Sequence, residues 1–233
     1  MKHIGIVDIT TIGACICANE IVALAAKDDI QKTGAHPEFT MHAFSFHLYK
    51  ELVLKKDWDG LAKLVLQSIH KLQKTGADFI IIPSNTPHYA IHAISAASPL
   101  PVLNLIEITA NECKRLGFRK AAILGTKATM EGGLYTSYLE KNLITPIIPE
   151  PIEMENINKL IFDEIIPSKI NVSNVEKVRQ DILRLDCDGI ILGCTELPEV
   201  YNEHNLIGKK VVDTTRLIAK KALEFSRFGQ LAS

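Results

Sequence analysis

The sequence has almost no net charge and no apolar run long enough to cross a membrane. Its 26 Lys and Arg side chains nearly balance its 27 Asp and Glu side chains, which leaves a formal net charge of −1. This balance gives no electrostatic basis for binding nucleic acid or an anionic membrane. A membrane-spanning helix needs about 20 consecutive apolar residues, and no segment reaches that length. We therefore expect neither a nucleic acid nor a membrane as a partner.

Cysteine and histidine are too few or too scattered to indicate a disulfide scaffold or a metal site. The five cysteines are odd in number, and the eight histidines show no metal-ligand spacing. Cys15 and Cys17 lie close together but lack further ligands nearby, so we expect both to face the core from a helix. The chain opens on an apolar strand rather than on a secretion signal. These features predict a reduced, cytoplasmic protein without a bound metal.

Apolar residues, by contrast, are abundant and follow two periods. They make up 47% of the 233 residues, enough to bury a sizeable core in one or two domains. The expected strands cover residues 4–7, 39–47, 79–82, 102–104, 121–124, 144–148, 189–192 and 210–212, and the expected helices cover residues 19–31, 57–75, 109–116, 131–141, 173–185 and 216–225. Ser173 and Glu176 have the spacing of a capping box. The alternation is typical of an α/β fold with mostly parallel sheets.

The most informative stretch is residues 188–198, a buried strand that ends at a cysteine. Residues 189–192 are apolar or small throughout, as expected for a strand covered on both faces. Cys194 follows where the chain must turn, and Thr195 has the side chain of a helix N-cap. The free N–H groups of the next turn favour an anion such as a thiolate, so we expect a lowered pKa for Cys194.

A second copy of this pattern occupies residues 78–88. Each copy begins with an aspartate, continues through an apolar run and ends in a small nucleophilic side chain, which is Ser84 here. Asn85 offers a hydrogen-bond donor and an acceptor, which suits a carboxylate held beside a reacting carbon. Thr86 suits the cap of a helix whose free N–H groups face a ligand. His88 could assist the reaction.

The two motifs, 110 residues apart, resemble the cofactor-independent Asp/Glu racemase superfamily. Further matching segments extend the resemblance over nearly the whole chain: residues 123–131, Tyr135, Tyr138, residues 148–150 and residues 157–162. The resemblance implies two pseudo-symmetric, Rossmann-like α/β/α half-domains with the active site in the cleft between them. In the family, strand-end cysteines of the two halves face each other across the substrate carbon without a cofactor. An amino-acid substrate and a homodimer are implied as well.

The resemblance also assigns roles to residues of both halves. The resemblance implies that Cys194 and Ser84 are the catalytic residues, and Ser84 stands where the family has its first cysteine. It also implies that the substrate is contacted by Thr10, Thr11, Asn85, Thr86, Thr126, Thr129, Thr195 and Glu196. The repeat predicts a first half-domain at residues 1–104, a second at residues 105–215, and a C-terminal helix and tail at residues 216–233.

Ser84 restricts the chemistry that this pair of residues can perform. Inverting a carbon centre without a cofactor requires an acid and a base on opposite faces of the substrate. A thiol with an ordinary pKa near ~8.5 can serve in either role, whereas the hydroxyl of Ser84 is far too weakly acidic to supply a base unaided. We therefore expect an isomerase, an amino-acid racemase in which Cys194 abstracts the Cα proton and Ser84 opposes it.

Several explanations of Ser84 stay open. It is either an introduced replacement of a cysteine or the native residue of an L-specific racemase. A lone thiol at Cys194 also resembles the arylmalonate-type decarboxylases, in which the thiol protonates an enediolate after carbon dioxide leaves. An interpretation of a different class is a ligand-binding relative that has lost catalysis.

The acidic segment at residues 149–158 leaves the substrate side chain open. Aspartate-specific relatives carry a cation on this stretch, which pairs with the distal carboxylate of the substrate. Here the stretch holds Glu150, Glu153 and Glu155 and no Lys or Arg. Three carboxylates repel a dicarboxylate unless they point away, so an acidic amino acid is not a safe expectation. A cation from elsewhere, such as Lys127, could replace the missing one.

Overall fold

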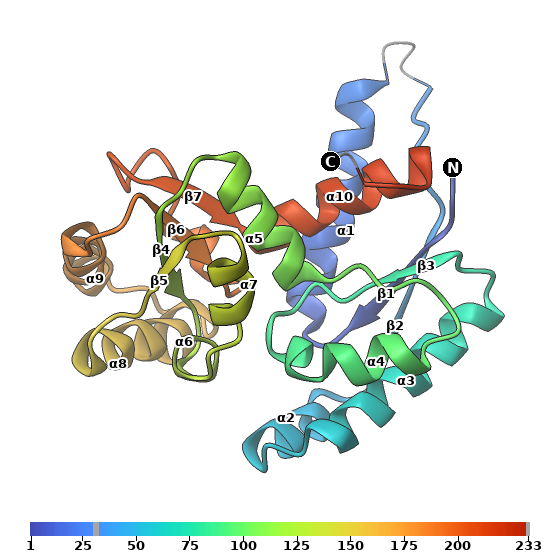
Figure 1. Cartoon of the computed structure of the whole chain (residues 1–233), viewed down its shortest axis with the longest axis horizontal. Helices are drawn as coiled ribbons and strands as arrows, with labels where there is room; N and C mark the ends of the chain where they lie inside the picture. Colours follow the sequence, from blue (N-terminus) through green and yellow to red (C-terminus); the bar gives the residue numbers. More distant parts are fainter. Residues whose placement is uncertain (30–32, 232–233) are drawn as a thin grey trace. The chain divides into compact units, whose positions relative to one another are not determined.

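In the computed structural model, which describes residues 1–29 and 33–231, strands and helices alternate along the chain (Figure 1). Every strand pair among these residues is parallel, so the predicted α/β fold with parallel sheets is confirmed. Internal contacts divide the chain into unit 1, Met1–Leu105 with Thr215–Ser233, and unit 2, Ile106–Thr214. No helix in the described part of the chain is both long and apolar enough to span a membrane.

Unit 1 is built on a three-stranded sheet in the order β2-β1-β3. Its elements are β1 (Ile4–Asp8), α1 (Thr11–Asp28), β2 (Phe39–Ala43), α2 (Phe46–Leu54), α3 (Trp58–Lys74), β3 (Phe79–Ile81), the 3-10 helix η1 (Thr86–Ala90), α4 (Ile91–Ala97) and, from the end of the chain, α10 (Thr214–Phe228). The connections from β1 to β2 and from β2 to β3 run in opposite directions along the sheet. Right-handed crossovers therefore place α1 on one face and α3 on the other (Figure 1).

Helix α3 shows how the sequence period creates the core of unit 1. Its N-cap is Asp57, whose carboxylate accepts a hydrogen bond of 2.8 Å from the Gly60 N–H. Its apolar face is fully buried against the sheet through Leu61, Val65, Ile69 and Leu72. Each buried side chain of this size stabilises the fold by about 1.5–3 kcal/mol. The helix predicted at residues 57–75 is thereby confirmed.

Unit 2 contains a four-stranded sheet in the order β5-β4-β6-β7. Its elements are α5 (Leu105–Arg115), β4 (Lys120–Leu124), α6 (Lys127–Glu131), α7 (Thr136–Lys141), β5 (Thr145–Ile147), α8 (Pro151–Lys159), the π-helix η2 (Leu160–Ile165), α9 (Val172–Arg184), β6 (Gly189–Leu192), the 3-10 turn η3 (Leu197–Glu199) and β7 (Lys210–Asp213). Helices α8 and α9 pack with η2 on one face of the sheet through a cluster of buried side chains. Strand β6 is central and buried along its whole length, as the apolar run at residues 189–192 predicts.

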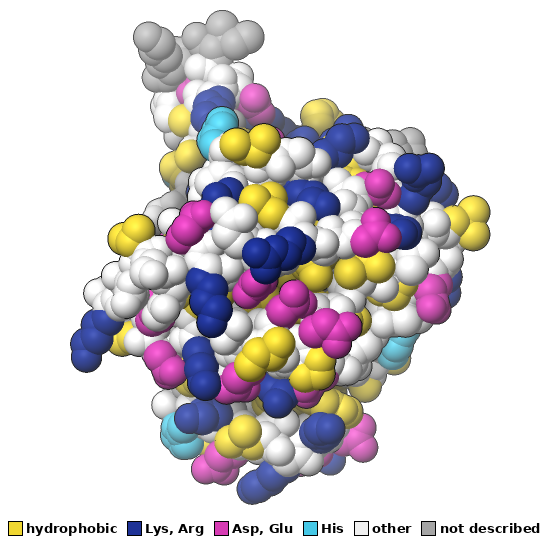
Figure 2. Space-filling view, turned by 90° about the vertical axis from the view of Figure 1, so that its left-hand side faces the viewer, with side chains coloured by type: hydrophobic (Ala, Val, Ile, Leu, Met, Phe, Trp, Pro, Cys, Tyr) yellow, Lys and Arg dark blue, Asp and Glu magenta, His cyan; other side chains and the backbone are white. Residues whose placement is uncertain are grey.

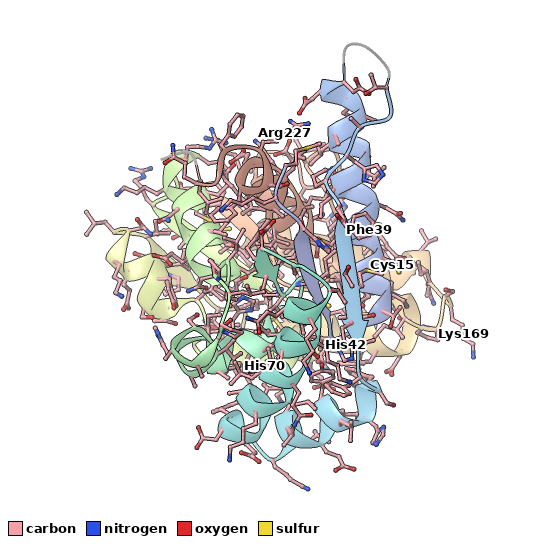
Figure 3. The ribbon with its side chains drawn as sticks, turned by 90° about the vertical axis from the view of Figure 1, so that its right-hand side faces the viewer. Cys15, Phe39, His42, His70, Lys169 and Arg227 are labelled. Atoms are coloured by element: carbon pink, nitrogen blue, oxygen red, sulfur yellow. The ribbon has the colours of Figure 1, made fainter. Side chains whose placement is uncertain are left out.

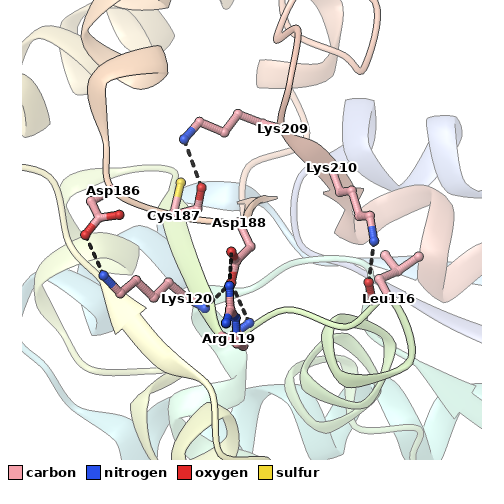
Figure 4. Close-up of polar contacts among 8 residues, drawn as sticks. All are labelled: Leu116, Arg119, Lys120, Asp186, Cys187, Asp188, Lys209 and Lys210. Atoms are coloured by element: carbon pink, nitrogen blue, oxygen red, sulfur yellow. Dashed lines mark hydrogen bonds and ion pairs between the residues drawn. The ribbon is translucent and has the colours of Figure 1, made fainter.

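The aspartate that opens each repeated motif holds the start of a neighbouring strand. Asp188 accepts hydrogen bonds from the backbone N–H groups of Arg119 (2.7 Å) and Lys120 (2.8 Å), where β4 begins (Figure 4). These two bonds hold the pKa of Asp188 below its ordinary value. In unit 1, Asp78 accepts the His3 N–H at 2.7 Å beside the start of β1. The repeated aspartates thus stabilise the amino edges of the two sheets, whereas ligands bind at carboxyl edges.

Strand β2 is shorter than the sequence predicts. The strand expected over residues 39–47 ends at Ala43, and α2 begins three residues later. Figure 3 shows β2 from the side, with His42 labelled on it. His47 lies on α2 instead, because a helix here brings Tyr49 into the core, where its exposed fraction is only 1%.

Helix α1 begins earlier than the sequence predicts. It starts at Thr11 rather than at Asn19, and the end expected near Gln31 lies outside the described residues. Cys17 is buried on this helix, as predicted, whereas Cys15 is exposed. The prediction for Cys15 was wrong because residues two apart on a helix point to different sides.

Two further elements differ from the prediction. The strand expected at residues 102–104 is a single bridge between Val102 and Ile80. The helix expected at residues 131–141 is divided into α6 and α7, because Gly133 adopts a φ of +68°, which a helix does not permit.

The capping box predicted from Ser173 and Glu176 is wrong as well. The N-cap of α9 is Asn171, whose side chain accepts the Ser173 N–H at 2.9 Å. Glu176 instead binds the guanidinium of Arg179 one turn further along the helix. The asparagine side chain already satisfies the helix start, so the glutamate is available for its charged neighbour.

Charges of both signs are mixed on the surface. Figure 2 shows one face on which basic and acidic side chains lie interspersed. Several form ion pairs within one helix, such as Arg179 with Glu176 and Lys159 with Glu155. Exposed pairs of this kind each stabilise a fold by about 0–1 kcal/mol, so the packed cores of the two units dominate stability.

Candidate active site

Each unit carries one of the two predicted catalytic residues just beyond the carboxyl end of a strand. In unit 1, β3 leads through Ser84 into η1. In unit 2, β6 leads through Cys194 into η3. Ligands of parallel sheets bind at this edge. The predicted site residues form two groups: the Ser84 group, which comprises Thr10, Thr11, Ser84, Asn85 and Thr86 of unit 1, and the Cys194 group, which comprises Thr126, Thr129, Cys194, Thr195 and Glu196 of unit 2.

His88 holds the loop of the Ser84 group. Its Nδ1 lies 2.9 Å from the Ser84 carbonyl oxygen, and its Nε2 accepts the Leu105 N–H at 3.2 Å. Because Nε2 accepts, the proton is on Nδ1, which donates to Ser84. Burial lowers the pKa of His88 to about 4, so the imidazole is neutral near pH 7. His88 therefore positions the loop rather than supplying a proton.

Asn85 and Thr86 lie at the start of η1. Asn85 is the N-cap residue, is almost fully buried and does not cap the turn with its side chain. Thr86 is the first residue of η1 rather than its cap, so the capping role predicted for it is wrong. The turn closes through the His88 N–H, which donates to the Asn85 carbonyl oxygen at 3.0 Å.

Asp8 adds a buried carboxylate that motif reasoning missed. It ends β1, its exposed fraction is 3%, and its Oδ1 has no hydrogen-bond partner among the described residues. Strand β1 pairs with β3 so that Ile6 lies opposite Ile81, which carries Asp8 toward the loop of Ser84. The sequence did contain a signal, because an aspartate directly follows the apolar run at residues 4–7.

Two of the three predicted threonines of unit 1 follow this carboxylate in the chain, and only one of them binds it. The side chain of Thr11 forms a hydrogen bond with Asp8, whereas Thr10 occupies the N-cap position of α1 without capping it. Burial raises the pKa of Asp8, and the Thr11 bond and the nearby His42 act in the opposite direction. The hydroxyl of Thr11 is therefore committed to Asp8 in this structure.

The thiol of Cys194 donates a hydrogen bond to a buried carboxylate. Its Sγ lies 2.8 Å from Oε2 of Glu196, and each residue has an exposed fraction of 8%. Burial raises the pKa of Cys194 well above its ordinary value, and the charge and hydrogen bond of Glu196 raise it further. The N–H groups of Glu196 and Leu197 act in the opposite direction and are outweighed. The predicted lowering of this pKa is therefore wrong, and Cys194 is a neutral thiol.

The short turn after β6 explains why the N–H groups are outweighed. η3 spans only three residues, and its N-cap is Glu196 rather than the predicted Thr195. A longer α-helix would add aligned peptide dipoles behind its first N–H groups, and a 3-10 turn of this length has few to add. Burial, reinforced by the carboxylate of Glu196, thus keeps the thiol protonated.

The turn after β4 packs directly on the turn that holds Cys194. The Gly193 N–H donates to the Leu124 carbonyl oxygen at 2.7 Å. A Cβ atom on Gly193 would lie 3.2 Å from Cγ2 of Thr129, so glycine permits this close approach. The hydroxyls of Thr129 and Thr126 are 3.2 Å apart. The structure thus packs the turn that carries both predicted threonines against Gly193, the residue before Cys194.

The carboxylates of the acidic segment are occupied within α8. Glu150 and Glu153 form a capping box, in which the Glu150 N–H donates to the Glu153 carboxylate at 2.8 Å. Glu155 pairs with Lys159 at 3.5 Å. Carboxylates that bind their own helix repel a substrate less than the sequence alone suggests.

Lys127, considered as a replacement cation for the substrate, is also paired. Its Nζ lies 3.6 Å from the carboxylate of Glu131 one turn along α6, and about half of its side chain is exposed. Its backbone N–H donates to the side chain of Asn158 at 2.9 Å. Within the described ranges, no three His, Cys, Asp or Glu side chains gather as a metal site.

Two similar proteins carry the names of racemases. The chain is 28% identical over 170 residues to the broad specificity amino-acid racemase RacX of Bacillus subtilis, which covers 72% of this chain and 73% of that protein. It is 26% identical over 187 residues to the glutamate racemase of Persephonella marina, over 75% of this chain and 70% of that protein.

Solved structures resemble the fold along almost the whole chain. A candidate Asp/Glu racemase from Yersinia pestis superposes with a TM-score of 0.89 at 28% identity, over 97% of this chain and 100% of that one. An aspartate racemase homologue from Pyrococcus horikoshii superposes with a TM-score of 0.83 at 26% identity, with the same coverage. The family model for Asp/Glu/Hydantoin racemase matches residues 15–222. The predicted resemblance is confirmed: the chain belongs to the Asp/Glu/Hydantoin racemase family and is an isomerase.

Proposed function

We propose that this protein is a cofactor-independent amino-acid racemase in which Cys194 exchanges the Cα proton and Ser84 occupies the opposing position. One observation carries the proposal: a thiol stands beyond the carboxyl end of a central strand and donates its S–H in a hydrogen bond to a buried carboxylate. The similarity to RacX, a broad specificity amino-acid racemase, supports it.

The chemistry uses one sulfur atom on one face of the substrate. As a thiolate, Cys194 takes the Cα proton: the Cα–H bond breaks, an S–H bond forms, and the electron pair moves into the substrate carboxylate to give a planar enediolate. Return of the proton from sulfur restores the original enantiomer. Delivery from the other face, by the Ser84 hydroxyl or by a water bound to it, gives the opposite enantiomer.

Substrate binding in this proposal draws on both groups. In this proposal the substrate contacts residues of the Ser84 group and residues of the Cys194 group. Asn85 and the hydroxyls of Thr10, Thr86, Thr126, Thr129 and Thr195 would hold the substrate carboxylate. Oδ1 of Asp8, which has no hydrogen-bond partner within the described part of the chain, suits the substrate ammonium group.

The two groups are expected to be unequal as proton carriers. A serine hydroxyl is a much weaker acid than a thiol, so it cannot act as a base in the same way. Proton abstraction from the Ser84 face should therefore be slow, and exchange should favour the L-enantiomer, as in the L-specific members that the sequence resembles. A homodimer is also expected from the resemblance, and light scattering of the purified chain tests it.

A second candidate is decarboxylation of an aryl malonate. The observation that favours it is the neutral state of Cys194, because a proton donor to an enediolate must start as a thiol. In this reaction the bond between Cα and one carboxyl carbon breaks, and carbon dioxide leaves. The electron pair stays on the substrate as a planar enediolate, to which the sulfur delivers its proton.

The deciding experiment follows the Cα proton by NMR in deuterium oxide with a panel of L- and D-amino acids. Loss of the Cα signal from L-substrates, abolished by Cys194→Ala but retained by Cys187→Ala, supports the racemase. Cys187 is a matched control because it opens the same strand at the opposite edge of the sheet. Carbon dioxide release from an aryl malonate would select the decarboxylase. Binding without exchange would select a relative that has lost catalysis.

A further inference from the structure

Helix α1 is apolar on both of its long faces, and only one of them is buried. The buried face consists of Gly13, Ala14, Cys17, Ala18, Ile21 and Ala25. The opposite face is exposed or half-buried, and we call its residues the α1 stripe: Ile12, Cys15, Ile16, Asn19, Val22, Ala23 and Ala26. A surface helix normally carries charged residues on its outer face, whereas a helix that is apolar all round is normally covered on all sides. The α1 stripe therefore has the composition of a covered surface.

The α1 stripe is continuous and contains no charged residue. Its members recur three or four positions apart, so they lie along one side of the helix over about 21 Å. Cys15, which Figure 3 labels on α1, is exposed within it. At its border, Glu20 is already paired with Arg216 of α10 at 3.7 Å. The stripe itself offers no charge to an ionic partner, so the surface that covers it must be uncharged as well.

We propose that a second copy of this chain covers the α1 stripe with its own α1 stripe, the two helices lying antiparallel about a two-fold axis at Asn19. Such an axis brings residues before position 19 opposite residues a similar distance after it in the other copy. Because the axis keeps each flank of the stripe facing the same flank of the other copy, the facing pairs are Ile12 with Ala26, Cys15 with Val22 and Ile16 with Ala23. Asn19 faces its own copy.

The sizes of the side chains favour this antiparallel orientation. In each of the three pairs a larger side chain meets a smaller one, which lets the two surfaces interdigitate. A parallel pair would place each residue against its own copy, so Ile12 and Ile16 would meet isoleucines and Ala23 and Ala26 would meet alanines. The side-chain amide of Asn19 has a donor and an acceptor, so it can hydrogen-bond to its own copy at the axis. A single asparagine within an apolar helix interface specifies how the helices pair.

Symmetry explains why a second copy fits better than a different protein. A different protein would have to present its own uncharged helix face with matching sizes, whereas a second copy supplies that face by the two-fold rotation. The inference gives a location to the homodimer that the resemblance implies. It does not depend on the racemase chemistry, and its tests use no substrate, so the two proposals fail separately.

The first test measures the mass of the full chain by light scattering in reducing buffer, over a range of protein concentrations. The wild type should be a dimer. Ala23→Lys places a charge inside the stripe and should halve the mass while the circular dichroism stays unchanged. Ala93→Lys, the same change at an exposed alanine of α4, is the matched control and should stay dimeric. A monomeric wild type overturns the inference, as does a dimer that Ala23→Lys leaves intact.

The second test uses Cys15 to determine the orientation of the two helices. After mild oxidation, Val22→Cys should form a covalent dimer in which peptide mass spectrometry finds residue 15 of one copy bonded to residue 22 of the other. The wild type should form none, because an antiparallel pair separates the two copies of Cys15 by about 12 Å along the helix, and a disulfide spans at most about 7 Å between Cα atoms. A bond between the two copies of Cys15 in the wild type would show a parallel pair and overturn the orientation. No covalent dimer in Val22→Cys would overturn the contact between the stripes.

Discussion

Unit 1 and unit 2 each contain a buried strand that begins after an aspartate and leads to a small side chain able to carry a proton. The beginnings are alike, since Asp78 and Asp188 both accept backbone N–H groups from a neighbouring strand. The ends differ. Ser84 is followed by a neutral His88 that holds its loop, whereas Cys194 is followed by Glu196, which accepts its hydrogen bond. The two copies share what builds a sheet edge and differ in what can move a proton.

The comparison of the two units separates the residues of the motif that the sheet needs from those that it does not need. The aspartates and the apolar runs recur because both sheets need a fixed strand start and a buried strand. The residues after the strand are not needed by the sheet, so they are free to differ between the units. We expect substitutions at the strand ends to change exchange rates and substitutions at the strand starts to change stability.

The largest effect should come from removing the proton carriers one at a time. Cys194→Ala should slow Cα exchange by about 10³-fold, whereas Ser84→Ala should slow exchange from the preferred enantiomer by less than about tenfold. Both rates are read by NMR in deuterium oxide. Equal losses in the two variants would show that the hydroxyl and the thiol contribute equally to proton transfer, which would contradict the expected difference between the two units.

A gain of function should follow when the two ends are made alike. Ser84→Cys places a second thiol in unit 1 and should raise exchange from the slower enantiomer by about 10²-fold. Chiral chromatography of the product then shows racemisation from both sides. Ser84→Thr is the control, because it changes the size of the side chain and keeps a hydroxyl. If the exchange rate of the slower enantiomer is unchanged in Ser84→Cys, residue 84 does not lie at the active site.

The next effect is on stability and concerns His88, which holds the loop of Ser84 in unit 1. His88→Leu should lower the free energy of unfolding by about 2–4 kcal/mol, because the Ser84 carbonyl and the Leu105 N–H each lose a buried partner at about 1–3 kcal/mol. Urea unfolding at pH 7 measures it. His92→Leu, a histidine change on the exposed side of α4, is the control.

The same histidine should make stability depend on pH. Since the folded pKa of His88 is lowered to about 4, the unfolded chain binds a proton at higher pH than the folded chain does. Its contribution to stability is thus complete above the unfolded pKa near ~6.5 and declines as the pH falls from there toward the folded value. In urea titrations at several pH values, the free energy of unfolding of His88→Leu should depend less on pH in this range than that of the wild type. An unchanged slope would mean that His88 is protonated in the folded protein.

The smallest effects should come from the strand starts, where the units are alike. Asp188→Ala removes two N–H acceptor contacts and should cost about 1 kcal/mol, given its partial exposure. Asp78→Ala removes one contact and should cost less. Thermal unfolding reads both, and Cα exchange by the folded variants should match the wild type. Loss of exchange without loss of stability would place one of these aspartates at the active site.

Much of the fold was accessible to reasoning from the sequence. The apolar run at residues 189–192 and the amphipathic stretch at residues 57–75 each have one clear period, and both elements are where the sequence predicts them. The predicted element boundaries are wrong where tertiary packing or a special backbone conformation decides them. Burial of Tyr49 favours a helix after Ala43, and Gly133 interrupts a helix that periodicity alone would continue.

The repeated motif led from the sequence to Ser84, Cys194, Thr86 and Thr195 as candidate site residues, and their roles stay predictions. The pKa of Cys194 was predicted in the wrong direction, because sequence cannot show that Glu196 folds back onto the thiol or that the turn is only three residues long. Asp8 was missed because the sequence shows only an aspartate after an apolar run. Its burial, and the lack of a hydrogen-bond partner for its Oδ1 among the described residues, are seen only in the structure.

The most direct measurement is Cα deuterium uptake from matched L- and D-amino acids by the unmodified protein near neutral pH. If the thiol of Cys194 supplies the only effective base, uptake should proceed from the L-enantiomer at least about tenfold faster than from the D-enantiomer. Equal uptake from both enantiomers would contradict this asymmetry between Ser84 and Cys194, and no uptake from either would contradict the racemase itself.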